Sequence, residues 1–134
     1  MNVLTSITVL GFLIFFHEMG HFLAAILQGI YVDGFSIGFG PSIIQKKFRD
    51  ITYSFRAFPL GGFVSFPDEE LNNIDPKDPN LLKNRPIIQR VIVISAGVFA
   101  NLILAYSILI INVTTVGIPF DPEPGILVLA TQPE

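Results

Sequence analysis

Two long apolar segments dominate the chain, and shorter alternating segments lie between them. Residues 3–27 contain no Lys, Arg or Asp, and residues 87–116 carry one charge, Arg90, near their start. At about 1.5 Å of rise per residue, either segment as a helix is long enough to cross a hydrocarbon core of about 30 Å. Gly29 suits the end of the first helix, and Pro86 suits the start of the second. Both segments are therefore predicted to be transmembrane helices.

A cleaved signal peptide is the alternative interpretation of residues 3–27. Such a peptide begins with basic residues and ends at a small-residue cleavage site. This segment has no basic start and no convincing cleavage site, and its apolar stretch is interrupted by ionisable side chains. We therefore interpret it as a retained helix.

The pattern changes between residues 30 and 66, where short runs rich in Ile, Val, Phe, Tyr and Thr are separated by Gly and Pro. Residues 51–58 alternate apolar and polar side chains in a two-residue period, which is typical of a half-buried strand. Arg49 and Asp50 would form the turn of a hairpin with residues 43–48. The region is predicted to be a small antiparallel sheet of about four short strands.

Polar residues and prolines then separate the elements. Residues 67–84 are rich in Asp, Glu, Asn, Pro and Lys without periodicity, which indicates a solvated connector. Residues 119–124 contain Pro119, Pro122 and Pro124, and residues 125–131 form a run that is typical of one strand. A single strand has no partners and no core, so it is not stable alone. The chain is therefore expected to stop inside a further domain.

Composition and charge place this pattern in a membrane. Of the 134 residues, 51% are hydrophobic and 14% are charged, whereas globular proteins average about 25% charged residues. The mean hydropathy is +0.61, and the net charge of −3 gives no reason to expect a nucleic-acid partner. All eight Lys and Arg lie between Lys46 and Arg90. The positive-inside rule then puts loop 28–86 in the cytoplasm (or the chloroplast stroma) and both termini on the opposite side.

The candidate chemistry is a His-Glu-x-x-His set, His17, Glu18 and His21, inside the first apolar segment. Residues four apart share one face of a helix, so the two imidazoles can bind one metal ion, and Glu18 can reach a water held by it. The bland alternative is a pair of structural histidines. With only two His in the chain, random placement would put them four apart about once in seventy times. Ionisable groups in a lipid-buried helix are also costly, which favours a functional site.

Four segments in chain order resemble one known family. They are residues 16–21 (Phe-His-Glu-Met-Gly-His), 34–41 (Gly-Phe-Ser-Ile-Gly-Phe-Gly-Pro), 58–64 (Phe-Pro-Leu-Gly-Gly-Phe-Val) and 96–101 (Ala-Gly-Val-Phe-Ala-Asn). This order resembles the site-2 protease family, intramembrane zinc metalloproteases that cut transmembrane helices of signalling substrates. The branch that it resembles most has an extracytoplasmic PDZ domain and occurs in bacterial plasma membranes and chloroplasts. Residues 124–128 are similar to the opening strand of that domain.

The resemblance implies roles for individual residues. His17 and His21 would be ligands of Zn²⁺, and Glu18 would be the general base. The stretch Pro59, Leu60, Gly61, Gly62 and Phe63 would belong to a membrane-associated hairpin that handles substrate, although from sequence alone an ordinary turn is an equal alternative. Asn101 could hydrogen-bond a substrate backbone or make a helix–helix contact. Members of the family often have Pro where this chain has Val98.

One part of the implied site is absent from the chain. Catalytic zinc usually has three protein ligands, and in this family the third is an Asp in a later transmembrane helix. Asp33 precedes Gly34 in a superficially similar pair but is better interpreted as a turn residue. The expectation is the N-terminal part of a multi-pass protease that acts on transmembrane protein substrates and is inactive alone. The alternative is a non-catalytic membrane scaffold, or a metal-binding subunit, that retains both His. A small transporter subunit is a weaker third, since inverted repeats and paired broken helices are missing.

Overall fold

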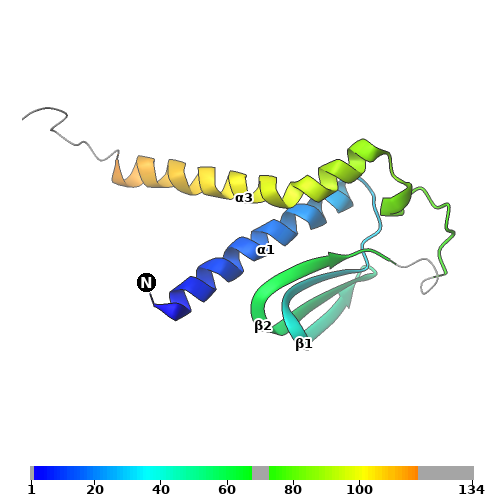
Figure 1. Ribbon diagram of the computed structural model, residues 1–134, viewed down its shortest axis with the longest axis horizontal. Coiled ribbons are helices and arrows are strands. Elements are labelled where there is room, and N and C mark those ends of the chain that lie inside the picture. The colour runs from blue at the N-terminus through cyan, green and yellow to red at the C-terminus, as the bar shows by residue number, and fades with distance from the viewer. Residues whose placement is uncertain (1, 68–72, 118–134) are drawn as a thin grey trace, which may run out of the picture.

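The computed structural model describes residues 2–67 and 73–117. Helix α1 (Val3–Leu27) lies between helix α3 (Ile87–Val116) and a sheet made of β1 (Gly34–Phe48) and β2 (Ile51–Ser65) (Figure 1). A short 3₁₀ helix, η1 (Leu82–Asn84), precedes α3. The predicted linker and PDZ-like strand, residues 119–134, lie outside the described residues.

The two long helices have the bounds that the apolar pattern predicted. Gly29 ends α1 with a φ of +66°, and the amides of Gly29 and Ile30 bond back to the carbonyls of Ile26 and Ala25. This is the paired bond pattern of a Schellman stop, which favours glycine. Both helices are long and apolar enough to cross a membrane, yet only 6% and 11% of their most apolar windows are buried. A core helix of a soluble protein would be mostly buried, so this packing favours a lipid environment.

The sheet differs from the prediction in its strands. Instead of about four short strands, the structure has two strands of 15 residues each, because the extended backbone of each strand continues through a bend where the pairing register shifts. The predicted hairpin between residues 43–48 and 51–58 is confirmed. Its turn residues Arg49 and Asp50 have φ values of 48° and 66°, as two-residue hairpin turns require to match the strand twist.

The bend in β1 gives its first half two neighbours. Residues 34–37 pair with residues 65–62, from Gly34 with Ser65 to Ile37 with Gly62. On their other side they pair with residues 52–55, from Gly34 with Thr52 to Ile37 with Phe55. The order across the sheet is therefore 44–48, 51–55, 34–37 and 62–65. Gly38 and Gly40 allow the bend, since both have a positive φ that residues with a side chain rarely adopt. Residues 62–65 form an edge of the sheet beside α1.

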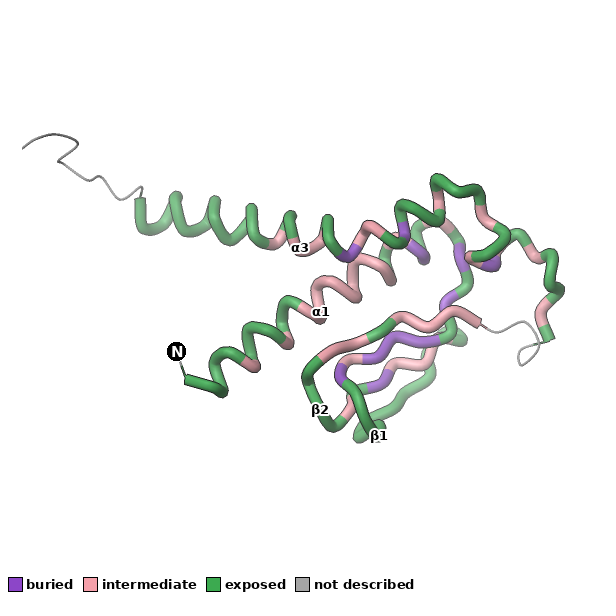
Figure 2. The backbone as a smooth tube through the Cα atoms, in the orientation of Figure 1, coloured by how far each residue is buried: buried purple, intermediate pink, exposed green. Residues whose placement is uncertain are grey.

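A small core joins these elements. Ala25 of α1, Val93 of α3, and Ile30 and Val32 of the segment after α1 form its buried cluster. Figure 2 shows the buried stretches gathered where the helices and the sheet meet, while the far part of α3 is exposed. Apolar side chains are therefore buried by protein only at the end of the molecule where the helices and the sheet meet.

The connector is more ordered than its composition predicted. Leu81 is 3% exposed, and the backbone amide of Tyr31 donates to the carbonyl of Asn80 at 3.0 Å. Arg85 donates to the carbonyl of Gly29 and to the side-chain oxygen of Asn80, at 2.8 and 2.7 Å. The second half of the connector is thus fastened to the C-terminal end of α1, which sets where α3 begins.

Candidate functional site

His17 and His21 point their Nε2 atoms at each other across one turn of α1. The two atoms are 3.1 Å apart, and both side chains are half-buried. Bonds of about 2.0–2.1 Å to a tetrahedral zinc ion put two ligand nitrogens about 3.3 Å apart. The spacing therefore fits two nitrogen ligands of one ion, and it also fits a hydrogen bond between the imidazoles.

The tautomer of His21 is set by α3. Its Nδ1 lies 2.7 Å from the carbonyl oxygen of Val93, and a carbonyl can only accept, so Nδ1 carries the proton. In the neutral ring, Nε2 then has a free lone pair directed toward His17. An N–H donated to a backbone carbonyl is the usual outer support of a metal-binding histidine. The two imidazoles are therefore arranged as zinc ligands are.

Glycines allow α3 to approach this close. A methyl group built on Gly97 would collide with Nε2 of His21 and would lie 2.7 Å from Nε2 of His17. On α1, a methyl group on Gly20 would lie 2.5 Å from the carbonyl oxygen of Ala96. The small residues of α3 had predicted close helix packing. The contact of Gly97 with both imidazoles, and the role of the Val93 carbonyl, were missed.

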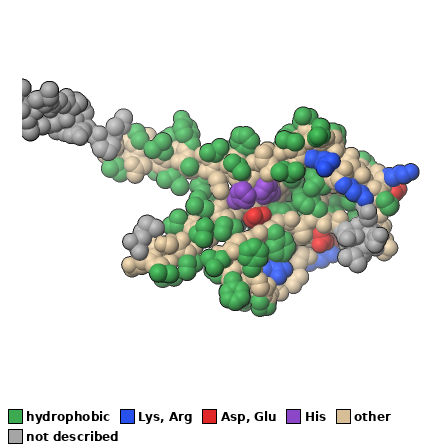
Figure 3. All heavy atoms as spheres, in the orientation of Figure 1, with side chains coloured by type: hydrophobic (Ala, Val, Ile, Leu, Met, Phe, Trp, Pro, Cys, Tyr) green, Lys and Arg blue, Asp and Glu red, His purple; other side chains and the backbone are tan. Residues whose placement is uncertain are grey.

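Glu18 borders a cleft between the helices and the edge of the sheet. The cleft has a volume of about 420 Å³, and its lining includes Glu18, His21, Gly62, Phe63 and Val93. A methyl group on Gly62 would lie 2.9 Å from Cγ of Glu18, so the backbone of β2 passes directly beside the carboxylate. Figure 3 shows both histidine side chains next to an acidic side chain in the hollow between the helices and the sheet.

The predicted substrate stretch is divided by the structure. Gly62 and Phe63 line the cleft, whereas Pro59 and Leu60 are exposed at the bend of β2. The carbonyl oxygen of Pro59 would lie 3.4 Å from a methyl group on Gly11, within the apolar part of α1. Gly61, with a φ of +139°, packs against the ring of Phe39. Gly62 and Phe63 are thus brought to the histidines, and the other three residues form the bend that leads to them.

Asn101 lies four residues beyond Gly97, and therefore on the same face of α3. Its Oδ1 atom is buried and has no hydrogen-bond partner among the described residues. The amide oxygen is free to accept a bond from a group outside that part of the chain. The two roles considered for Asn101, a hydrogen bond to a substrate backbone and a helix–helix contact, both stay predictions.

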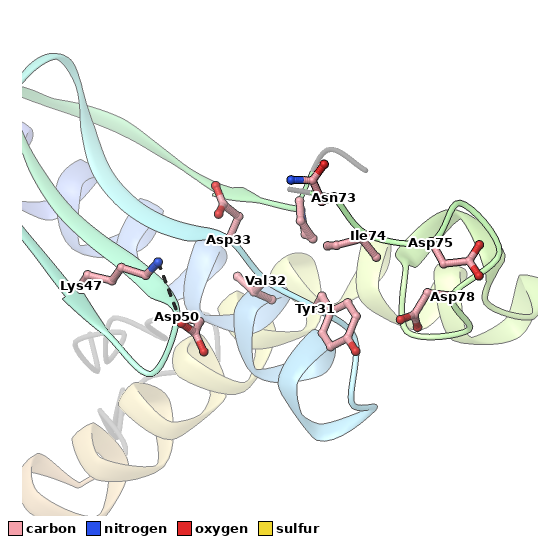
Figure 4. A pocket seen from close by; sticks show the side chains of 10 residues that line it. Tyr31, Val32, Asp33, Lys47, Asp50, Asn73, Ile74, Asp75 and Asp78 are labelled. Atoms are coloured by element: carbon pink, nitrogen blue, oxygen red, sulfur yellow. Dashed lines mark ion pairs between the residues drawn. The ribbon is translucent and has the colours of Figure 1, made fainter. Parts of the chain in front are cut away.

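Asp33 lies in a different hollow. Its backbone bonds to Ser65 and Thr52 and joins it to the sheet. Its side chain lines a space of about 520 Å³ with Tyr31, Asp50 and other residues (Figure 4). Asp33 is not part of the lining of the histidine cleft. Across residues 2–67 and 73–117, no group of three His, Cys, Asp or Glu is placed to hold a metal ion.

Comparison with known proteins identifies the family. The model of Peptidase family M50 matches residues 5–131. A Nostoc protein named "Putative zinc metalloprotease" is 53% identical over all of this chain and 37% of its own length. The chloroplastic membrane metalloprotease ARASP of Arabidopsis thaliana is 53% identical over 95% of this chain and 29% of its own length. The chain thus spans about a third of the curated relatives that it matches. It belongs to peptidase family M50, the site-2 proteases that its four motifs resemble.

Proposed function

We propose that this chain supplies the His-Glu-x-x-His part of the active site of a zinc-dependent intramembrane protease. The relatives named as zinc metalloproteases support the metal and the reaction class. The observation that carries the proposal is the 3.1 Å approach of the Nε2 atoms of His17 and His21, with the Nδ1 proton of His21 held by the Val93 carbonyl. A structural pair of histidines would need no carboxylate and no substrate-sized cleft beside it, and here both are present.

The residues divide the work of peptide hydrolysis among them. When bound by His17 and His21, zinc would supply Lewis-acid chemistry that makes water a nucleophile near neutral pH. Glu18 accepts the proton of the attacking water and delivers it to the leaving amine. The Val93 carbonyl keeps the His21 proton on Nδ1, so that Nε2 remains a ligand. Gly97 leaves the room that both imidazoles occupy against α3.

The edge of β2 is the proposed substrate-binding element. A helical substrate must give up its internal hydrogen bonds before a peptide bond can be attacked, and unpaired backbone groups are costly in lipid. Within the described chain, residues 62–65 pair only with residues 34–37. Their other edge can take up an extended substrate by strand addition. Gly62 then places that substrate beside Glu18, and Asn101 offers an unpaired oxygen from α3.

The proposed site needs a third zinc ligand from outside the described residues, because catalytic zinc uses three. We assign it to an Asp in the remaining C-terminal part of the protease, so the chain alone should be inactive. A non-catalytic scaffold or metal-binding subunit that retains both His is the alternative. It predicts zinc binding without cleavage in the complete protein.

We also propose that α1 and α3 cross a bacterial plasma membrane or a chloroplast membrane, with loop 28–86 cytoplasmic or stromal. Both helices have the length and apolarity for it, and the positive charge lies between them. Single cysteines at Asn2 and Lys47 test the orientation, because this chain has no native Cys. A membrane-impermeant maleimide should label Lys47→Cys only from the cytoplasmic side and Asn2→Cys only from the opposite side. Labelling of both from one side would contradict the topology.

The central test is Glu18→Gln in the complete protein, with a model transmembrane substrate. Loss of a general base should lower kcat by about 10²–10⁴-fold, while bound zinc, measured by atomic absorption, stays unchanged. Asp33→Asn is the matched control, since Asp33 lies outside the cleft; its cleavage rate should match that of the unmodified protein. Undiminished cleavage by the Glu18 variant would refute the mechanism. Zinc binding without cleavage by the unmodified protein would favour the scaffold.

A further inference from the structure

Arg56 joins three segments of the sheet with one guanidinium group. Its Nη1 donates to the carbonyl oxygen of Gly40 at 2.8 Å, and its Nε donates to Oγ of Ser36 at 3.3 Å. The guanidinium carbon also lies 5.1 Å from the centre of the Phe63 ring, which is a cation–π distance. Arg56 thus contacts the first half of β1, the bend of β1 and the edge segment of β2.

Arg56 has no acidic partner in the described part of the chain, and the nearby pair of Lys47 and Asp50 does not include it. Arg56 is half-buried. Its guanidinium is bound by a carbonyl, a hydroxyl and an aromatic ring, and not by a carboxylate. These contacts indicate a role in the geometry of the three segments rather than in surface solubility.

The bend that Arg56 holds is tight. A methyl group on Gly38 would lie 2.6 Å from the carbonyl oxygen of Phe58 and 3.3 Å from Cβ of Arg56. The bend of β1 therefore rests directly on β2 around residues 56–58. Pro59, the next residue of β2, lies against α1 at Gly11. The position of the β1 bend therefore affects the distance between β2 and α1.

Phe63 connects the contacts of Arg56 with the candidate catalytic residues. It pairs with Ser36 in the sheet register and lines the cleft beside Gly62. Gly62 in turn lies against Glu18. A shift of Phe63 therefore changes the separation between the edge segment and the carboxylate.

We propose that Arg56 is a positioning residue: it locks the bend of β1 and the ring of Phe63, and so holds the edge of β2 against α1. Arginine suits the task because its donors point in different directions and its flat face stacks on a ring. A lysine has one ammonium group, which can reach Gly40 but not also bond Ser36 and cover Phe63. The role rests on the proposed function only in its effect on substrate binding.

Cross-linking tests the positioning without any need for activity. In the complete protein, cysteines at Gly11 and Pro59 are joined with a short thiol cross-linker, in otherwise unmodified, Arg56→Met, Arg56→Lys and Ser36→Ala backgrounds. We expect a several-fold lower cross-link yield with Arg56→Met and Arg56→Lys, and a smaller decrease with Ser36→Ala. Lys46→Met is the matched control, an exposed cation on the same sheet, and should leave the yield unchanged. If the Arg56→Met protein does not accumulate, the cross-link yields of Arg56→Lys and Ser36→Ala test the proposal instead.

Kinetics on a transmembrane substrate test the consequence for binding. Arg56→Met and Arg56→Lys should raise KM by about fivefold to tenfold with kcat nearly unchanged, because substrate binding and not chemistry is weakened. Wild-type cross-link yields in both Arg56 variants would overturn the proposal, as would a fall in kcat at constant KM. If the unmodified complete protein cleaves nothing, the proposed function fails, and the cross-link yields still decide whether Arg56 positions the edge.

Discussion

The two halves of α3 are both mainly apolar but have different surroundings. Residues 87–101 contain the buried residues of the helix, Val93 and Gly97, and they pack against α1 around the histidines. Residues 102–116 contain no buried residue, and Ile103 and Tyr106 are 67% and 66% exposed. Figure 1 shows this second half extending away from α1 and the sheet.

This contrast teaches that small residues, and not hydropathy, decide where α3 packs. Gly97 and Ala96 lie in the first half, where contact between backbone and side chains is closest. The second half carries mainly branched and aromatic side chains and has no glycine. In lipid there is little hydrophobic drive between helices, so close packing depends on small side chains and polar contacts. The packed half carries the candidate site, and the outer half, residues 102–116, is an exposed apolar helix.

The largest effect is expected from adding a side chain at Gly97, where α3 lies closest to the two imidazoles. Gly97→Val would place an isopropyl group, three carbon atoms, against the imidazoles, so the histidines must separate or α3 must move. We expect the complete protein to lose at least about tenfold in zinc affinity, comparable to the loss of an outer support of a ligand. Zinc titration with a competing chelator measures this. Ala105→Val adds similar bulk to the exposed outer half, and it should bind zinc like the unmodified protein. Equal affinities for the two variants would refute the assigned role of Gly97.

The elements were predictable from local pattern, because each depends on neighbours in sequence. The apolar runs predicted both helices, and Gly29 ended α1 as its lack of a side chain allows. The alternation in residues 51–58 and the Arg49–Asp50 turn predicted the hairpin. The double pairing of residues 34–37 was not predictable, since it depends on a bend that is set by contacts across the sheet.

The candidate site divides in the same way. His17 and His21 could be paired from their spacing, since a helix puts them on one face. The Val93 carbonyl that supports His21 could not, because every residue has a carbonyl and only the crossing of the helices selects this one. The glycine run in β2 could be noticed, but its contact with Glu18 depends on how the sheet rests on α1. The third zinc ligand remains a prediction about the rest of the protein.

The smallest effects are expected for the free energy of unfolding, when one apolar side chain in each half of α3 is shortened to Ala. Val93 is 2% exposed and belongs to the buried cluster, so Val93→Ala should destabilise the complete protein by about 1–3 kcal/mol through lost packing. Ile108 is 53% exposed. If its half is surrounded by lipid, Ile108→Ala exchanges one apolar contact for another and should cost less than about 0.5 kcal/mol. Unfolding in mixed micelles with increasing dodecyl sulfate measures both free energies. A cost for Ile108→Ala that equals that of Val93→Ala would mean that protein, and not lipid, covers the outer half in the complete molecule. The two halves would then differ only in which part of the protease packs on them.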